Sequence, residues 1–513
     1  MLQTKDNRQL IRLLFAALWI ILTALVLMRI FWRLDAAPAE NTDEAWYGVN
    51  TCEMFESGDW IIPTMRHEID YGSKPPLQLW LILLFYTILG PGDLALRLPA
   101  ACATLLLFIL ISAHLVRRYG TRTAVLFAAA FPVIWRCFYL HGFRSGDMDG
   151  LFCLFFAIAV IALREAAEGS SASLIVYGLS IALGFLTKSM HAGLFFLIGL
   201  LYLPILWKKL RPKTVWSSFA AAVTPPIIWL LLLLRRENGL TLFYTLTIGE
   251  FANKVGGDTS SALPRYLADL GREKIIWLLV LLSLIRALLS VLRRGSGPDA
   301  APLHRRFGSW CREHLLLLLA LFVPLAVYGL FGSYMAWYIY PTYVSAAVLA
   351  AVLAGECVSL LAGSGEDGEH RGSRAAAAVF FCCVTVACAA YTANQLYDYR
   401  LLGTGGNLTD ALRGDLMDYQ AQNGDIYRGK HAYFALDRQR NYGDRGHWQL
   451  EDLFYGYAIT GFDCRDGGVE AFLEDEDSLI ILDGDLWDEY AGVLTGHVFL
   501  EMNTFYVMNH DWY

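Results

Sequence analysis

Charged side chains in two short segments are the residues of this chain whose types and spacing could do chemistry. The first segment holds the adjacent carboxylates Asp43 and Glu44, and the second holds Arg144, Asp147 and Asp149 within six residues. A carboxylate can take a proton from an acceptor hydroxyl. An arginine can hold a phosphate and neutralise its charge as it leaves. This combination is suited to transfer of a group from a phosphate carrier to a hydroxyl.

Four further polar residues lie at or near the ends of apolar runs. Lys74 precedes two prolines, which fix the backbone and limit the swing of its side chain. Arg97 lies near the start of a long apolar run, and Lys188 and His191 lie in the turn between two others. Charge at such positions is expensive unless it is exposed or paired. These residues are therefore candidates for binding a phosphate.

Each of these side chains also has a purely structural interpretation. The first carboxylate pair could be a solvated helix start, and Arg97 could pair with Asp93 at a membrane interface. His191 could cap a helix, and Arg144 could hold one of the neighbouring aspartates. The residue types permit these groups to converge on one site but do not establish it.

The composition indicates which elements must position these residues. The chain has 513 residues, of which 56% are hydrophobic and only 17% are charged, whereas soluble chains carry about 25% charge. Long apolar runs account for the excess, so a polytopic membrane protein is expected. Such a composition argues against three classes of protein: a disordered chain, a nucleic-acid-binding protein and an ordinary cytoplasmic enzyme.

Runs of about 17 to 25 apolar residues predict membrane-spanning helices. Eleven are predicted, near residues 10–28, 96–116, 124–141, 150–164, 173–188, 191–207, 215–234, 274–292, 315–331, 338–361 and 375–394. Several loops between them are rich in Lys and Arg, which predicts that these loops and the N-terminus face the cytoplasm. Leu77–Leu89 is too short to span and is interpreted as a helix at the outer interface. The first loop, residues 33–94, and the second loop, residues 142–149, are then extracytoplasmic.

The last part of the chain differs in charge. Leu396–Tyr513 contains 22 acidic and 8 basic residues, a net charge of −14, which leaves +7 for the rest of a chain whose total is −7. Alternation and helical spacing predict a small α/β domain. Strands are expected at Lys430–Leu436, Ser478–Leu482 and His497–Met508, and helices at Asn407–Gln420 and Trp448–Ala458. The predicted domains are residues 1–395 and 396–513. Cys52 and Cys464 both fall outside the spans and could pair in an oxidising compartment.

The order of several motifs resembles the large GT-C membrane glycosyltransferases, and in particular their protein mannosyltransferase and aminoarabinose (lipid A) transferase branch. The resemblance covers roughly residues 10–395. It rests on Asp43-Glu44, Gly58-Asp59-Trp60-Ile61-Ile62-Pro63, Lys74-Pro75-Pro76-Leu77, Leu96-Arg97-Leu98-Pro99-Ala100, Arg144-Ser145-Gly146-Asp147-Met148-Asp149-Gly150-Leu151, Leu186-Thr187-Lys188 and Trp337-Tyr338-Ile339-Tyr340-Pro341. It implies a GT-C fold with juxtamembrane helices in the first outer loop.

The resemblance also implies a function. A sugar would be moved with inversion from a polyprenyl-phosphate carrier, such as undecaprenyl phosphate, to an acceptor on the extracytoplasmic face. The acceptor would be lipid A, a protein or another glycan. The rival interpretation is a transporter or flippase of lipid-linked sugars, whose polar groups would gather near the bilayer midplane. A bacterial inner membrane is the expected location, and no nucleic acid is an expected partner.

By the family pattern, Asp43 would be the catalytic base or a carboxylate that orients the acceptor, and Glu44 would support it. Asp149 is the acid of the second loop, and the role of Asp147 is open. Lys74 contacts the donor phosphate. Weaker candidates for phosphate binding or loop anchoring are Arg144, Arg97, Lys188 and His191, and Tyr338 belongs to an aromatic pair that either binds substrate or lies in an interfacial belt. A divalent cation bound by the aspartates and Glu44 is a further possibility, and the metal requirement stays open.

Overall fold

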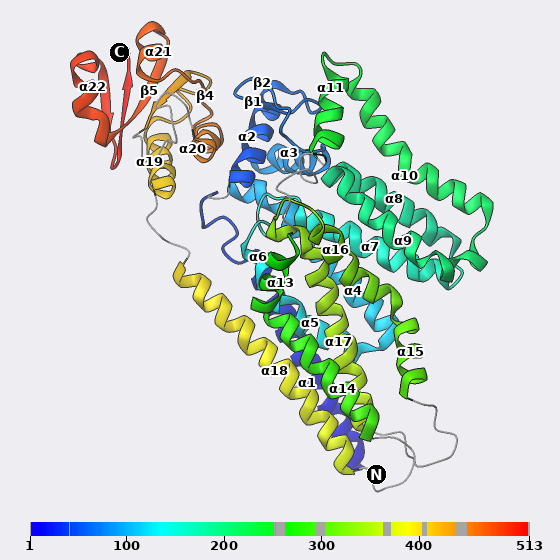
Figure 1. Cartoon of the computed structure of the whole chain (residues 1–513). Helices are drawn as coiled ribbons and strands as arrows, with labels where there is room; N and C mark the ends of the chain where they lie inside the picture. The colour runs from blue at the N-terminus through cyan, green and yellow to red at the C-terminus, as the bar shows by residue number, and fades with distance from the viewer. Residues whose placement is uncertain are drawn as a thin grey trace. The chain divides into compact units, whose positions relative to one another are not determined.

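The computed structural model describes residues 2–39, 42–250, 252, 262–292, 303–362, 371–402, 408–436 and 449–510 (Figure 1). The chain divides into two compact units. The first contains Met1–Trp32, Ala100–Arg144 and Met148–Arg400, and the second contains Arg33–Pro99, Ser145–Asp147 and Leu401–Tyr513. The first loop and the acidic tail therefore belong to one unit.

The first unit is built from helices. They are α1 (Leu2–Phe31), most of α4 (Asp93–Tyr119), α5 (Thr121–Ala130), α6 (Trp135–Tyr139), α7 (Asp149–Ala167), α8 (Ser171–Lys188), α9 (Gly193–Leu206), α10 (Pro212–Leu233), α11 (Gly239–Tyr244), α13 (Leu263–Arg272), α14 (Lys274–Leu292), α15 (Leu303–Glu313), α16 (Leu315–Gly329), α17 (Tyr340–Ala362) and α18 (Arg371–Leu402). Short 3-10 turns occur at Phe131–Val133, Ser189–Ala192, Trp207–Lys209 and Ala336–Ile339, and a π-helical turn occurs at Thr245–Gly249.

Eight helices of the described residues are long and apolar enough to cross a membrane, or nine if one bent pair counts as a span. The chain is therefore an integral membrane protein, as predicted, but eleven spans are more than these criteria find. Three places account for the difference. The run 124–141 is broken near Pro132, because α5 ends at Ala130 and a 3-10 turn follows at Phe131–Val133. The run 173–207 is part of one continuous stretch, Ser171–Lys209. The run 315–331 forms one bent pair with His304–Glu313.

The stretch Ser171–Lys209 turns back on itself. The hydroxyl of Tyr177 on α8 donates to the carbonyl of Phe195 on α9, at 2.9 Å. In a straight helix these two residues would be about 27 Å apart. Ser189, between the two helices, has a φ of +48°, which is uncommon for a residue with a side chain. The predicted helices near 173–188 and 191–207 are therefore the two arms of a hairpin.

Close helix packing in the first unit depends on small residues. Helix α8 packs against both α7 and α10, and α17 packs against α5, α14 and α16 (Figure 1). Gly355 of α17 lies so close to α5 that a Cβ atom there would be 2.6 Å from Thr123 Oγ1. Buried alanines line much of α17, including Ala346, Ala347 and Ala350. Such small side chains let helix backbones approach in a membrane.

The second unit combines the first loop with the acidic tail. Its elements are α2 (Thr42–Ser57), β1 (Thr64–Met65), β2 (Glu68–Ile69), α3 (Leu77–Leu89), the start of α4, α19 (Leu408–Asn423), β3 (His431–Ala435), α20 (Leu450–Tyr455), a π-helical turn at Gly456–Thr460, β4 (Asp463–Cys464), α21 (Gly468–Glu474), β5 (Ser478–Asp483), α22 (Trp487–Leu494), β6 (Val498–Glu501) and β7 (Phe505–Asn509). The helix predicted at Leu77–Leu89 has those bounds in the structure.

The tail forms a five-stranded mixed sheet with the order β4-β3-β5-β7-β6. Strand β3 runs parallel to β4 and β5, and β7 runs antiparallel to β5 and β6. Ile480 is paired with Tyr433 on one side and Met508 on the other, and all three belong to the core that α21 and α22 help to close. The predicted α/β character is confirmed, but the strand predicted at His497–Met508 is a hairpin of two strands. Residues 407 and 448, at the starts of the two predicted helices, lie outside the described residues.

The tail is tied to the first loop by α20. Gly48 of α2 lies against the Phe454 ring, and a Cβ at this glycine would be 2.6 Å from Phe454 Cδ2. The Tyr455 hydroxyl donates to Asp93 Oδ1 at 2.9 Å and accepts the Ala39 N–H at 2.6 Å. Arg413 of α19 forms an ion pair with the other oxygen of Asp93, at 3.0 Å.

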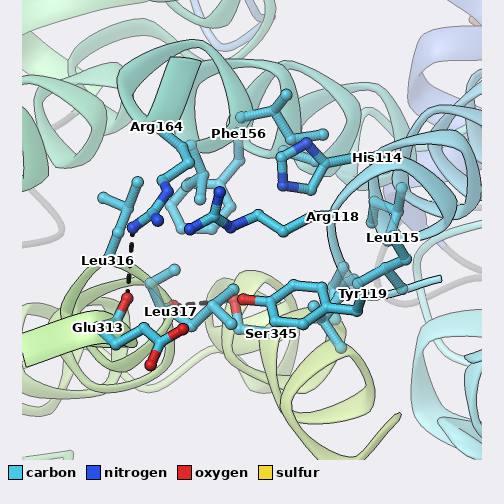
Figure 2. A pocket seen from close by; sticks show the side chains of 17 residues that line it. His114, Leu115, Arg118, Tyr119, Phe156, Arg164, Glu313, Leu316, Leu317 and Ser345 are labelled. Carbon is cyan, nitrogen blue, oxygen red and sulfur yellow. Dashed lines mark hydrogen bonds between the residues drawn. The ribbon is translucent and has the colours of Figure 1, made fainter. Parts of the chain in front are cut away.

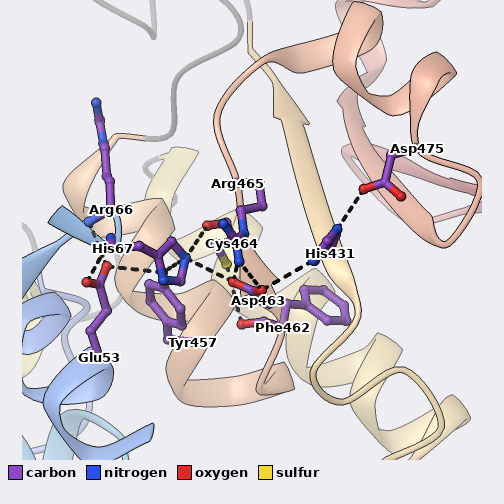
Figure 3. A network of polar contacts seen from close by, with 10 residues as sticks. All are labelled: Glu53, Arg66, His67, His431, Tyr457, Phe462, Asp463, Cys464, Arg465 and Asp475. Carbon is purple, nitrogen blue, oxygen red and sulfur yellow. Dashed lines mark hydrogen bonds and ion pairs between the residues drawn. The ribbon is translucent and has the colours of Figure 1, made fainter. Parts of the chain in front are cut away.

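A polar network makes a second connection between loop and tail (Figure 3). The turn between β1 and β2 consists of Arg66 and His67, both with positive φ, at +55° and +62°. Glu53 of α2 accepts their backbone N–H groups at 2.7 and 3.1 Å. Tyr457 of the tail donates to the same Glu53 carboxylate at 3.1 Å. The carboxylate thus holds a turn that most side chains disfavour.

Candidate active site

A buried ion pair lies at the ends of two helices of the first unit. Asp149 is the first residue of α7, and Lys188 is the last residue of α8. Lys188 Nζ is 2.5 Å from Asp149 Oδ1, and both side chains are buried. An acidic residue at a helix start and a basic one at a helix end are each favoured by the helix dipole. Removing two charges from water still costs several kcal/mol per ion, so this pair is a candidate functional site.

His141 completes the surroundings of Asp149. Its Nδ1 is 3.4 Å from Asp149 Oδ2, so the carboxylate has a cationic or potentially cationic group on each oxygen. The His141 ring is stacked on Trp337 with 3.8 Å between ring centroids and 3° between planes. His141 has a φ of +51°. A non-glycine residue in this region stores strain, and such residues cluster at functional sites.

Aromatic rings cover the other side of the ion pair. Lys188 Nζ lies 4.8 Å from the centroid of the Tyr338 ring. His191 is 4.8 Å from Tyr338, and its Nδ1 is 3.1 Å from the Tyr328 hydroxyl. A cation over an aromatic face is stabilised by up to about 2 kcal/mol when desolvated. The structure therefore brings together four of the residues singled out in the sequence analysis: Asp149, Lys188, His191 and Tyr338.

Arg144 anchors the second loop to α1. Its guanidinium donates to the carbonyls of Arg29, at 3.3 Å, and Trp32, at 2.6 Å. It also lies 5.6 Å from the centroid of the Tyr139 ring. Asp149 is instead paired with Lys188, so the interpretation in which Arg144 holds this aspartate is not supported by the contacts. Arg144 is placed to position the loop.

In the second unit, Glu44 and Arg97 form a buried bidentate pair. Arg97 Nε is 2.7 Å from Glu44 Oε1, and Nη2 is 3.0 Å from Oε2. The same guanidinium donates to the carbonyls of Leu34, Ala37 and Pro38. The alternative in which Arg97 pairs with Asp93 is not supported, because Asp93 is engaged by Arg413 and Tyr455. With its donors occupied, Arg97 is an anchor for the start of the first loop.

Gly146 connects the second loop to Glu44. Its N–H donates to Glu44 Oε1 at 2.7 Å, and its carbonyl accepts from Gln78 Nε2 of α3 at 3.0 Å. A Cβ at Gly146 would be 2.8 Å from Leu96 Cγ and 3.2 Å from Glu44 Cγ. Next to it, Asp147 is fully buried and accepts from the Ser145 hydroxyl at 2.6 Å. Glu44 therefore acts as a junction between α2, α4 and the second loop.

Asp43 and Lys74 are both residues of the first loop. Asp43 lies in the first turn of α2, and both side chains are half-buried. By contrast, Glu44 is buried. The segment after Lys74 is fixed by Pro75 and Pro76, and α3 begins directly after them.

Two groups near the candidate residues were missed by the sequence analysis. One is His141. It could have been found as an ionisable residue two positions before the Phe143-Arg144 pair of the second loop. The other is Arg136 of α6, which pairs with Asp269 at 3.0 Å and with Glu273 at 3.1 Å. No local spacing links residues more than a hundred positions apart, so this second cluster carried no sequence signal.

A separate cavity lies between α4, α7, α16 and α17 (Figure 2). Figure 2 shows Arg118 and Arg164 side by side across the cavity from Tyr119 and Glu313. Arg164 lies in the last turn of α7, about 22 Å along the helix from Asp149. The cavity is therefore distinct from the Asp149 cluster. Among the described residues, no group of three or more His, Cys, Asp or Glu side chains is placed to hold a metal ion.

The two cysteines considered for pairing are free thiols. Cys52 lies on α2 and Cys464 on β4, and both are buried. Burial raises the pKa of both thiols well above the ordinary value. A thiol in this state is a poor nucleophile.

Comparisons with known proteins identify relatives of part of the chain. A sequence model of the family described as dolichyl-phosphate-mannose-protein mannosyltransferase matches residues 73–229. An undecaprenyl phosphate-alpha-4-amino-4-deoxy-L-arabinose arabinosyl transferase from Edwardsiella ictaluri is 28% identical over 231 residues, which are 43% of this chain and 41% of that protein. A second enzyme of that name, from Pseudomonas fluorescens, is 29% identical over 213 residues, 39% of this chain and 36% of its own length. The matched regions thus span less than half of these relatives.

Solved structures show the same fold over nearly the whole chain. The crystal structure of ArnT from Cupriavidus metallidurans bound to undecaprenyl phosphate matches with a TM-score of 0.67 and 16% identity, over 95% of this chain and 97% of that one. The apo structure of the same protein matches with a TM-score of 0.65. The resemblance to GT-C glycosyltransferases of the protein mannosyltransferase and aminoarabinose transferase type is thereby confirmed, and the chain has the fold of ArnT.

Proposed function

We propose that the protein is an integral-membrane glycosyltransferase that takes a sugar from an undecaprenyl-phosphate carrier and attaches it to lipid A. The observation that carries this proposal is the buried Asp149–Lys188 pair, flanked by His141 at 3.4 Å. The pair lies at helix ends, where an interfacial enzyme needs its polar groups, and not in the middle of spans, where a transporter would hold them. Relatives named as undecaprenyl phosphate-alpha-4-amino-4-deoxy-L-arabinose arabinosyl transferases support the choice of donor.

The proposed location is the bacterial inner membrane, with the N-terminus in the cytoplasm. The loops rich in Lys and Arg then face the cytoplasm. Asp43, Asp149 and the acidic tail lie on the extracytoplasmic side in this arrangement. Sugar bound to a lipid phosphate is the donor chemistry suited to that side, because activated nucleotide sugars are made in the cytoplasm.

The proposed reaction is a single displacement with inversion. The acceptor oxygen forms a bond to C1 of the sugar, and the bond between C1 and the carrier phosphate oxygen breaks. The leaving phosphate keeps the electron pair, and Lys74 neutralises its charge. With a hydroxyl acceptor, the displaced proton passes to the Asp43 carboxylate. An ionised phosphate oxygen of lipid A has no proton to lose, so Asp43 then orients the acceptor.

In this proposal Asp149 and Lys188 act together, because Asp149 holds the Lys188 ammonium group in position. A free Lys188 ammonium could bind a phosphate, but its 2.5 Å contact with Asp149 occupies one donor and leaves two. His141 on the other Asp149 oxygen keeps the carboxylate oriented. Asp149 and His141 are thus positioning residues for Lys188, whose Nζ lies 4.8 Å from the centroid of the Tyr338 ring.

The test is sugar transfer by the purified full-length protein, with undecaprenyl-phosphate aminoarabinose as donor and lipid A as acceptor. Asp43→Asn and Lys74→Ala are expected to reduce transfer by at least a hundredfold, the scale of general-base and oxyanion contributions. The matched controls are Asp425→Asn and Lys209→Ala, which change exposed side chains, and both should keep full activity. Normal transfer by both folded test variants would disprove the proposal. The requirement for a divalent cation, which the sequence leaves open, is tested in the same assay by adding a chelator.

A further inference from the structure

A large groove lies between α14, α15, α16 and α17 of the first unit. Its volume is about 1080 Å³, at the upper end of ligand pockets, which measure about 300–1,000 Å³. The walls are apolar side chains of α14, α16 and α17, among them Leu284, Phe322 and Leu353. Leu284 is 64% exposed and Phe322 is 57% exposed, so the groove opens on a surface that faces hydrocarbon in an integral membrane protein. Its walls suit acyl chains.

One edge of the groove is formed by a basic amphipathic helix. Helix α15 meets α16 at 76°, so it does not continue the direction of that span. Phe307 and Trp310 of α15 line the groove, together with Arg306 and His304. A short amphipathic helix that carries basic residues beside aromatic ones is typical of the membrane interface. The mouth of the groove is thus placed at the level of lipid head groups.

Glu356 of α17 fixes this helix in place. Trp310 Nε1 donates to both carboxylate oxygens of Glu356 at 3.1 Å. Arg286 of α14 forms an ion pair with the same carboxylate, and its guanidinium lies 4.6 Å from the Trp310 ring centroid. His314 Nε2 is 3.3 Å from Glu356 Oε1. The Glu356 carboxylate, which contacts the groove residues Arg286 and Trp310, is therefore already shared by Arg286, Trp310 and His314.

The basic side chains at the mouth, Arg306 and His304, are in a different situation. Arg306 and His304 are exposed, and Arg306 has no hydrogen bond or ion pair within the part of the chain that the structure describes. Arg305 is also exposed, but it does not line the groove. An arginine at the edge of an apolar groove can bind a phosphate with two N–H groups while the groove takes the attached chains. The arrangement is complementary to an anion that carries an apolar tail.

We propose that this groove binds an anionic phospholipid of the bilayer. Arg306 and His304 hold the phosphodiester, and the acyl chains lie against α14 and α16. The site is separate from the one under "Proposed function", since Leu353 lies about 20 Å along α17 from Tyr340. A zwitterionic lipid would bring an ammonium group to an already cationic mouth. Free phosphate would gain nothing from the apolar walls.

The first measurement uses the full-length protein in neutral detergent. Phosphatidylglycerol with brominated acyl chains quenches the fluorescence of a tryptophan that it touches, and the Trp310 signal is obtained as the difference between the wild type and Trp310→Phe. Saturable quenching by brominated phosphatidylglycerol is expected, with weaker quenching by phosphatidylcholine carrying the same chains. Inorganic phosphate should not displace the lipid. Equal quenching by both lipids, or displacement by inorganic phosphate, would overturn the proposal.

Two matched variants test the assignment of the head group. Arg306→Gln is expected to weaken phosphatidylglycerol binding about fivefold, which corresponds to about 1 kcal/mol for one basic residue near an anionic surface. Arg305→Gln removes the same charge from the adjacent position and should change binding less than twofold. Equal weakening by both variants would show diffuse surface attraction and would contradict the proposal. Ser283→Phe, which fills the groove, should abolish quenching with Arg306 intact, and retained quenching would count against the site.

Discussion

His67 Nε2 lies 2.9 Å from Asp463 Oδ1, and this contact joins two residues that are 396 positions apart in the chain. The hydrogen bond to Asp463 raises the pKa of His67 above its ordinary value. Burial alone would raise the pKa of Asp463, but hydrogen bonds from His67 and Arg465 hold it at about 2. Both shifts favour the charged forms, so the contact between the first loop and the tail depends on pH.

The pH dependence follows from the signs of these shifts. The raised pKa of His67 stabilises the fold fully below about pH 6.5, its unfolded value, and this contribution is lost as pH rises through the folded pKa. The lowered pKa of Asp463 contributes above about pH 3.8 and is lost as pH falls toward 2. His67→Gln should therefore lower Tm more at pH 5.5 than at pH 8.5. Both side chains are partly exposed, so the effect is small.

The measurement is Tm of the wild type and of His67→Gln at the two pH values. His497→Gln is the matched control, because His497 contacts the carbonyl of Leu494. The change in Tm that His497→Gln causes at each pH is subtracted before the two pH values are compared for His67→Gln. A Tm difference for His67→Gln that grows from pH 5.5 to 8.5 would contradict the assigned direction.

The Asp149–Lys188 pair can be tested with a double-mutant cycle. Asp149→Asn and Lys188→Met each leave one buried charge without its main partner, which costs about 3–5 kcal/mol of unfolding free energy. The double variant should be more stable than the sum of the two single effects, because it leaves no unpaired charge. Its transfer activity should nevertheless stay low. Recovery of both stability and activity in the double variant would show that the pair is only structural.

The Glu44–Arg97 junction should behave differently. Arg97→Lys keeps the charge but cannot form the bidentate pair together with three carbonyl contacts. A loss of Tm is expected, with KM for the lipid donor unchanged, because this guanidinium is already occupied. Arg211→Lys, at an exposed position, is the control and should leave Tm unchanged. A large rise in the donor KM for Arg97→Lys would instead indicate direct phosphate binding.

Gly146 offers a test of how tightly the second loop is held. In Gly146→Ala the new methyl group meets Leu96 and Glu44 at 2.8 and 3.2 Å, and overpacking of this kind costs about 1–3 kcal/mol. Gly414→Ala on α19 is the control, since no atom lies within 4 Å of a Cβ there. It should stabilise the helix by up to about 1 kcal/mol. Chemical unfolding of both variants gives the comparison, and equal stabilities would disprove the close approach at Gly146.

Local patterns predicted the elements well where one sequence feature decides the outcome. Leu77–Leu89 is bounded by prolines before it and by Gly90 after it, and the helix has the predicted ends. Leu479–Leu482 is a continuous apolar run in the tail and forms the middle of the central strand β5. In both cases backbone chemistry and hydrophobic period agree, so no tertiary contact is needed to choose between structures.

Tertiary partners could not be read in the same way. Arg97 has Asp93 four residues before it on the same helix, yet it binds Glu44, which is 53 positions away. Helical spacing favoured the local pair, but burial and three nearby carbonyls favour the distant one. The apolar run 124–141 looked like one span, and the break near Pro132 places Arg136 beside Asp269 and Glu273. Such partners depend on the assembled fold.

The packing of α2 against α20 also determines when the first loop can complete its packing during synthesis. A ribosome adds about 5–20 residues per second, so Phe454 is made roughly 20 to 80 s after Gly48, against which it packs. During that interval Glu53 lacks the hydrogen bond that the Tyr457 hydroxyl donates to it in the finished protein. A nascent chain therefore holds its first loop incompletely packed until the tail emerges. Chains truncated before residue 454 would keep α2 in that unfinished state and should be degraded faster than the full-length protein.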